Sequence, residues 1–133
     1  MMTDPARRKA EMIVAAARDH KAFDLVLLDI AGLTNIADFF FICSCRSSRQ
    51  VQAVAEHIQE EMKKSGGWLP LGVEGRAQGH WALLDYGDVV AHVFYEPQRH
   101  FYDLESLWAD APRVELASES EPPTRRTGRG GSR

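Results

Sequence analysis

Residues 79–108 read GHWALLDYGDVVAHVFYEPQRHFYDLESLW, and this stretch decides the fold. Two alternating apolar runs, Trp81 to Tyr86 and Val89 to Tyr95, flank the dipeptide Gly87-Asp88. A two-residue loop that begins with glycine closes antiparallel strands through a primed turn, so the stretch predicts a β-hairpin. Apolar residues at helical spacing follow Pro97 and predict a short helix, or two helical turns joined by a bend. We expect its residues Phe101, Leu104 and Trp108 in the core.

The two faces of this hairpin differ in chemistry. One face carries mostly small and aliphatic side chains, as a sheet needs where helices cover it: Ala82, Leu84, Tyr86, Val89, Ala91 and Val93. The other face mixes bulky aromatic residues with an acid and a histidine, in the cross-strand pairs Trp81 with Phe94, Leu83 with His92 and Asp85 with Val90. We therefore expect this second, mixed face to be a binding surface.

The rest of the chain supplies the other elements. Asp4-Pro5 predicts the N-cap of a first helix that reaches about His20, and residues 25–30 and 38–44 are apolar runs typical of buried strands. Ser47 and Gln50 have the spacing of a capping box, which predicts a second helix ending in a left-handed stop at Gly66. Its core stripe is Val51, Val54, Ala55, Ile58 and Met62. Residues 68–73 predict an edge strand, because Pro70 cannot donate a ladder hydrogen bond.

The resulting order is α-β-β-α-β-β-β-α, which predicts an α/β fold with a mixed five-stranded sheet and helices packed on it. A chain of 133 residues is long enough for one domain, which we place at residues 1–116. Residues 117–133 are rich in Pro, Gly, Ser and Arg and predict a disordered tail.

Charge and composition limit the function classes. The net charge is −3, and the tail contributes four Arg and two Glu, which leaves −5 on the domain. An acidic domain is a poor match for phosphate backbones, so we expect at most weak RNA contact, made by the tail. No apolar run approaches the ~20 residues of a membrane helix, and the first residues lack an apolar export segment. We expect a cytoplasmic protein in which Cys43 and Cys45 stay reduced.

The sequence offers no convincing catalytic or metal site. Cys43 and Cys45 point to one face of a strand, but a zinc site needs about four ligands and no second pair is present. The acids Asp103 and Glu105 diverge on a helix, and Ser44 lacks the glycine-flanked turn of a hydrolase nucleophile. We predict no enzymatic activity, no metal, no cofactor and no small-molecule substrate. The alternative is a transferase whose turn at residues 44–48 binds phosphate at a helix N-terminus.

Two blocks of residues resemble a known family. The first block is ADFFFICS at residues 37–44, followed by Ser47 and by RQV at residues 49–51. The second block comprises Glu74-Gly75, the hairpin from Trp81 to Phe94, and Arg99, Tyr102, Leu104-Glu105 and Leu107-Trp108. In order and spacing these residues resemble the ribosomal silencing factors, also called the Iojap or RsfS family, over roughly Pro5 to Pro112.

The resemblance implies a topology like that of nucleotidyltransferases without their catalytic carboxylates, and a function without chemistry. Because such a fold would admit a nucleotide, a nucleotidyltransferase-like enzyme is the alternative. Members bind the large ribosomal subunit at its fourteenth protein, obstruct joining with the small subunit and repress translation when nutrients are scarce. Matched positions together with the hairpin face define the expected partner-binding residues: Trp81, Leu83, Asp85, His92, Arg99, Tyr102 and Glu105. Trp81, Arg99 and Tyr102 are the expected anchors, because interfaces concentrate binding energy in these residue types.

Two points stay open in the sequence. Cys45 replaces a family glycine, which matters if that glycine has a backbone angle closed to other residues. Phe39 and Ala91 are milder departures. The second open point is a homodimeric adaptor, in which a second copy of the chain is the partner.

Overall fold

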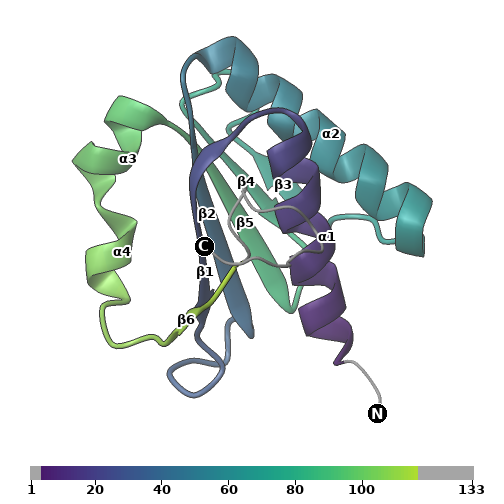
Figure 1. Ribbon diagram of the computed structural model, residues 1–133, viewed down its shortest axis with the longest axis vertical. Coiled ribbons are helices and arrows are strands. Elements are labelled where there is room, and N and C mark those ends of the chain that lie inside the picture. The colour runs from purple at the N-terminus through teal and green to yellow at the C-terminus, as the bar shows by residue number, and fades with distance from the viewer. Residues whose placement is uncertain (1–3, 117–133) are drawn as a thin grey trace, which may run out of the picture.

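The computed structural model describes residues 4–116, which fold as a sheet with helices on both sides (Figure 1). Along the chain the elements are α1 Pro5–Asp19, β1 Phe23–Asp29, β2 Phe39–Cys45, α2 Ser48–Gly66, β3 Gly72–Glu74, β4 Trp81–Asp85, β5 Val89–Tyr95, α3 Glu96–Tyr102, α4 Leu104–Leu107 and β6 Arg113–Val114. The α/β class is confirmed, and so is the bend in the last helix, since α3 and α4 meet at Asp103.

The sheet has the strand order β3-β4-β5-β2-β1-β6 and is mixed, because β2 and β5 are parallel while the other neighbours are antiparallel. The expected count of five strands is wrong, since β6 adds a sixth at the edge beside β1. It pairs through two residues only, Val114 with Leu27 and Arg113 with Leu28. Two residues are too few to show alternation, so only the tertiary contact with β1 makes them a strand.

The hairpin has the predicted register. Trp81 lies opposite Phe94 and Leu83 opposite His92. The Tyr86 amide donates to the Val89 carbonyl at 2.9 Å, and Gly87 has φ of 87°, the left-handed conformation that a primed turn requires at its first central position.

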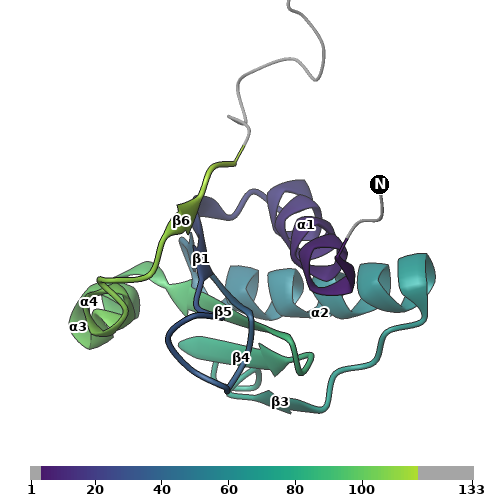
Figure 2. The same ribbon diagram turned by 90° about the horizontal axis from the view of Figure 1, so that it is seen from below.

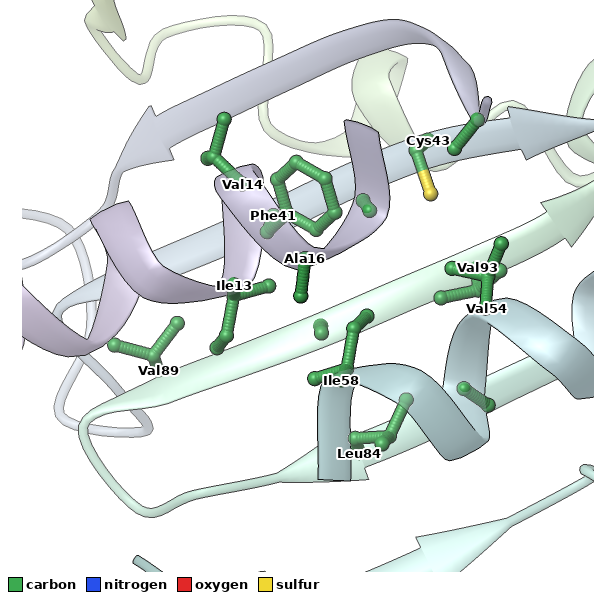
Figure 3. Close-up of a cluster of buried hydrophobic side chains, with 14 of the residues drawn as sticks. Ile13, Val14, Ala16, Phe41, Cys43, Val54, Ile58, Leu84, Val89 and Val93 are labelled. Carbon is green, nitrogen blue, oxygen red and sulfur yellow. The ribbon is translucent and has the colours of Figure 1, made fainter. Parts of the chain in front are cut away.

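Helices α1 and α2 cover one face of the sheet, and α3 and α4 lie on the other, as Figure 2 shows. The larger core lies between α1, α2 and the first face. Figure 3 shows Ile13 of α1 and Ile58 of α2 in one cluster with Phe41 of β2 and Leu84 of β4, and all four side chains are fully buried. Burial of one such large side chain stabilises the fold by about 1.5–3 kcal/mol. The hairpin residues predicted for this face all belong to this core.

Caps define the two long helices. The Asp4 side chain accepts from the Ala6 amide, and the Ser47 hydroxyl accepts from the Gln50 amide at 3.0 Å. Gln50 Oε1 in turn accepts from the Arg46 amide at 2.6 Å. The predicted stop at Gly66 is off by one residue, because Gly66 ends α2 and Gly67, with φ of 67°, adopts the left-handed conformation.

The third strand lies at the sheet edge as predicted but is shorter than residues 68–73. The Trp68 amide still bonds to the Met62 carbonyl of α2, so the chain joins the sheet only at the Leu71 amide, which donates to the Asp85 carbonyl at 2.7 Å. Within residues 4–116 no helix is long and apolar enough to cross a bilayer.

Candidate docking surface

Trp81 and His92 form the centre of the second face of the sheet. The Trp81 indole Nε1 donates a hydrogen bond to His92 Nδ1 at 3.1 Å. Because indole can only donate, Nδ1 must be an acceptor, which places the proton of the neutral imidazole on Nε2. His92 is 3% exposed, and burial lowers its pKa to about 4, so the ring is neutral at physiological pH. His92 therefore acts as a buried, neutral hydrogen-bond acceptor for Trp81 and does not present a charge at the surface.

The Trp81 ring connects this buried pair to the surface. On one side it stacks on Phe94 with 4.8 Å between ring centroids, and on the other it packs against Tyr102 of α3 at 4.7 Å. Trp81 is half-buried, and Tyr102 is 49% exposed. The two aromatic side chains thus form one contiguous surface from two elements that the sequence separates by 21 positions.

Leu83 and Asp85 extend the surface along β4. Both side chains are half-buried, and Leu83 packs against the smaller core of the second face. The Asp85 Oδ1 accepts from the Gly87 amide at 2.8 Å, so this carboxylate also stabilises the hairpin turn.

Arg99 and Glu105 occupy a different place from the one expected. The Arg99 side chain is 9% exposed, and its Nε and Nη2 atoms donate to the two Glu105 oxygens at 3.0 and 3.2 Å. The hydrogen bond from Arg99 lowers the pKa of Glu105 below its usual value, so the pair is ionised. The structure does not present Arg99 as an exposed anchor, because its guanidinium is already fully engaged inside the protein.

The sequence missed Phe101, which we expected in the core. It is 78% exposed and makes an edge contact with Tyr102 at 5.1 Å between ring centroids. Leu107 of α4 is also exposed, at 76%. A continuous helix would place Phe101 on the same side as Leu104 and Trp108. However, Asp103 has φ of 49°, which interrupts the helix. Phe101 therefore does not share a face with Leu104 and Trp108.

The groups that suggested chemistry are engaged in structural contacts. Ser44 is buried and accepts from Arg99, while Ser47 caps α2. Cys43 and Cys45 are both fully buried in the larger core, and burial raises the pKa of the Cys43 thiol well above its usual value. Among residues 4–116 no group of three or more His, Cys, Asp or Glu side chains could hold a metal ion.

Cys45 fits its position without strain. It ends β2, is completely buried, and is not among the described residues with positive φ. The position of Cys45 therefore does not need the backbone freedom of glycine.

The chain is thus an α/β domain with an aromatic surface on one sheet face and a helical core on the other. Residues 3–131 match the family model described as ribosomal silencing factor during starvation. The chain is 44% identical over 106 residues to the ribosomal silencing factor RsfS of Halalkalibacterium halodurans, covering 80% of this chain and 90% of that protein. It belongs to the ribosomal silencing factor family.

A solved structure and a distant relative extend this comparison. A crystal structure of a Chromobacterium violaceum protein, 31% identical, superimposes with a TM-score of 0.77 and covers 90% of this chain and 95% of that chain. A mouse protein named mitochondrial assembly of ribosomal large subunit protein 1 is 26% identical over 123 residues, which are 88% of this chain and 54% of that protein. The expected likeness to nucleotidyltransferases stays a prediction.

Proposed function

We propose that this protein is a translation repressor that binds the large ribosomal subunit and prevents its joining with the small subunit. The binding site on the ribosome is the fourteenth protein of the large subunit, and the trigger is nutrient limitation. Membership of the ribosomal silencing factor family supports this proposal, as does the name of the mouse relative, which refers to assembly of the large subunit. The protein acts in the cytoplasm on this proposal.

The observation that carries the proposal is the exposed aromatic cluster of Trp81, Tyr102 and Phe101. These side chains come from β4 and α3, and the Tyr102 ring contacts both of the other two. Tyrosine and tryptophan provide large contact area with little conformational freedom to lose, so a few of them carry most of the energy of an interface. About 800 Å² on each partner is enough for a specific complex. Leu83 and Asp85 extend the same surface along β4.

The mechanism is steric occlusion and needs no nucleotide turnover. A rigid domain docks through the aromatic cluster, and its body then occupies volume that the small subunit requires. The rigidity comes from the helical core on the opposite face, where α1 and α2 pack on the central strands. Control comes from the abundance of the protein and from competition with the small subunit.

Co-sedimentation with isolated large subunits tests the proposal. We expect the folded protein to pellet with large subunits at micromolar concentration and to reduce joining with small subunits in a sucrose gradient. Tyr102→Ala should lose binding while keeping the circular dichroism of the wild type. The matched control is Leu69→Ala, since Leu69 is 66% exposed and lies beside α2, away from the aromatic cluster. A folded wild-type protein that stays in the supernatant, or that leaves subunit joining unhindered, would refute the function.

A further inference from the structure

The aromatic cluster depends on a segment with few apolar attachments to the sheet. We name residues 96–112, which contain α3, α4 and the turn toward β6, the strap. Among its residues, only Arg99 and Ala111 are buried. Leu104 and Trp108 are half-buried against the second face, and the Trp108 ring meets Phe40 edge-on at 5.3 Å. These apolar contacts lie at the α4 end, whereas Tyr102 lies at the α3 end.

At the α3 end the strap crosses a hollow instead of an apolar core. This hollow has a volume of about 580 Å³ and lies between the strap and the edge of the sheet. Its walls are mostly polar and come from both sides: Asp24, Leu25 and Val26 of β1, Ser44 of β2, Arg99, His100, Asp103 and Glu105 of the strap, and Arg113 of β6. Apart from the Tyr102 ring on Trp81, the bonds that hold the strap here are polar.

Arg99 makes the bonds that cross this hollow. Its Nη1 donates to the Ser44 hydroxyl at 2.8 Å and to the Asp24 carbonyl at 2.7 Å, which ties α3 to β2 and β1. The other edge of the guanidinium holds both oxygens of Glu105. A planar guanidinium with several donors can satisfy such a set of acceptors, and a lysine ammonium cannot reproduce its two-point pairing with a carboxylate.

The Arg99 and Glu105 pair also spans the break between the two helices. Arg99 lies in α3 and Glu105 in α4, on either side of Asp103 with its left-handed backbone. Arg99 and Tyr102 are three residues apart in α3 and are therefore neighbours on the helix surface. Bonds that fix the Arg99 side chain therefore also fix the position of Tyr102. Asp103 interrupts the helix, and this salt bridge links α3 to α4 across the break.

We propose that Arg99 and Glu105 are positioning residues that hold the strap across the hollow and thereby keep the Tyr102 ring against Trp81. The role rests on the proposed function of the aromatic cluster, and it assigns to Arg99 no contact with the ribosome. A substitution that breaks the pair of Arg99 and Glu105 keeps Trp81 and Tyr102 in the protein but moves their rings apart.

The test compares three variants of the full chain: Arg99→Lys, Glu105→Gln and the control Arg113→Gln. Arg113 also approaches Glu105, at 3.4 Å, but its side chain is 62% exposed and it makes no bond to β2. Binding to isolated large subunits gives the functional result. Nuclear Overhauser contacts between the Trp81 and Tyr102 rings give an independent structural result in the unbound protein.

We expect Arg99→Lys and Glu105→Gln each to weaken binding by about tenfold or more, equal to about 1.4 kcal/mol, and to lose the ring contacts. Arg113→Gln should stay within about twofold of the wild type, as exposed ion pairs contribute little. If Arg99→Lys fails to fold by circular dichroism, Glu105→Gln carries the test alone.

Two results would overturn the proposal. Retained ring contacts in Arg99→Lys and Glu105→Gln would show that the pair does not position Tyr102, whatever happens to binding. Loss of binding with intact ring contacts would instead assign Arg99 to the partner. Failure of the wild-type chain to bind large subunits rejects the proposed function, and the ring contacts still decide the positioning role.

Discussion

Trp81 and His92 are bonded across β4 and β5 by a hydrogen bond of 3.1 Å in which the indole donates to the imidazole Nδ1. This bond links a half-exposed aromatic residue of the docking surface to a buried ring beneath it. It needs a neutral histidine, because a protonated Nδ1 has no lone pair to accept.

Removal of the indole donor should destabilise the domain. Trp81→Phe keeps an aromatic ring but leaves the buried His92 Nδ1 without a donor, and an unsatisfied buried acceptor costs about 1–3 kcal/mol. Urea unfolding should show this loss. In a His92→Leu background the same substitution should cost clearly less, since no acceptor is then left unpaired. Equal losses in both backgrounds would contradict a hydrogen-bond role.

The stability of the domain should fall as pH decreases from about 6.5 toward 4. Burial holds the pKa of His92 at about 4 in the folded protein, below the ordinary value of 6.5, so in this range the unfolded chain binds more protons. Protonation therefore favours unfolding, with a total effect of roughly 3 kcal/mol. His92→Asn keeps an acceptor for Trp81 but does not titrate. The difference in unfolding free energy between wild type and His92→Asn should change with pH, and parallel curves would refute this origin.

Phe101→Ala should separate binding from stability. The side chain is 78% exposed, so the unfolding free energy should change by no more than about 0.5 kcal/mol. Binding to large subunits should weaken, because the Phe101 ring extends the aromatic cluster beside Tyr102. Unchanged binding in a pull-down with isolated subunits would limit the docking surface to Trp81, Tyr102 and β4.

The two cysteines should be unreactive in the folded protein. Cys43 and Cys45 are fully buried, and the raised pKa of Cys43 keeps that thiol protonated. A colourimetric thiol reagent at pH 8 should therefore label them only as fast as the domain opens, and urea should expose both. Rapid labelling under native conditions would mean that β2 is accessible to solvent without unfolding.

A chain that ends at Leu116 should fold and keep its thermal stability. Leu116 packs against the larger core, so the truncation retains it, and residues 117–133 lie outside the described part of the chain. The tail carries four Arg, so its removal should reduce the salt dependence of binding to large subunits if it contacts RNA. A marked loss of thermal stability would show that the domain extends beyond residue 116.

Local patterns determined most of the secondary structure. Gly87-Asp88 set the hairpin register, because a two-residue turn fixes which residues face each other and the side-chain period of two then assigns each face. The capping residues Asp4 and Ser47 marked the starts of both long helices, since their side chains bond to amides only a few positions away. These features depend on neighbours within about one turn, and a sequence contains that information directly.

Tertiary structure decided which of the candidate docking residues are exposed. Arg99 and Tyr102 are three residues apart and both suited the docking surface, yet Arg99 is buried on Ser44 and Asp24 while Tyr102 faces outward. Strand β6 exists only because β1 lies beside it, and Phe101 is exposed where the helix is interrupted at Asp103. Each of these outcomes depends on bonds between segments far apart in the chain or on one unusual backbone angle, and neither leaves a periodic pattern in the sequence.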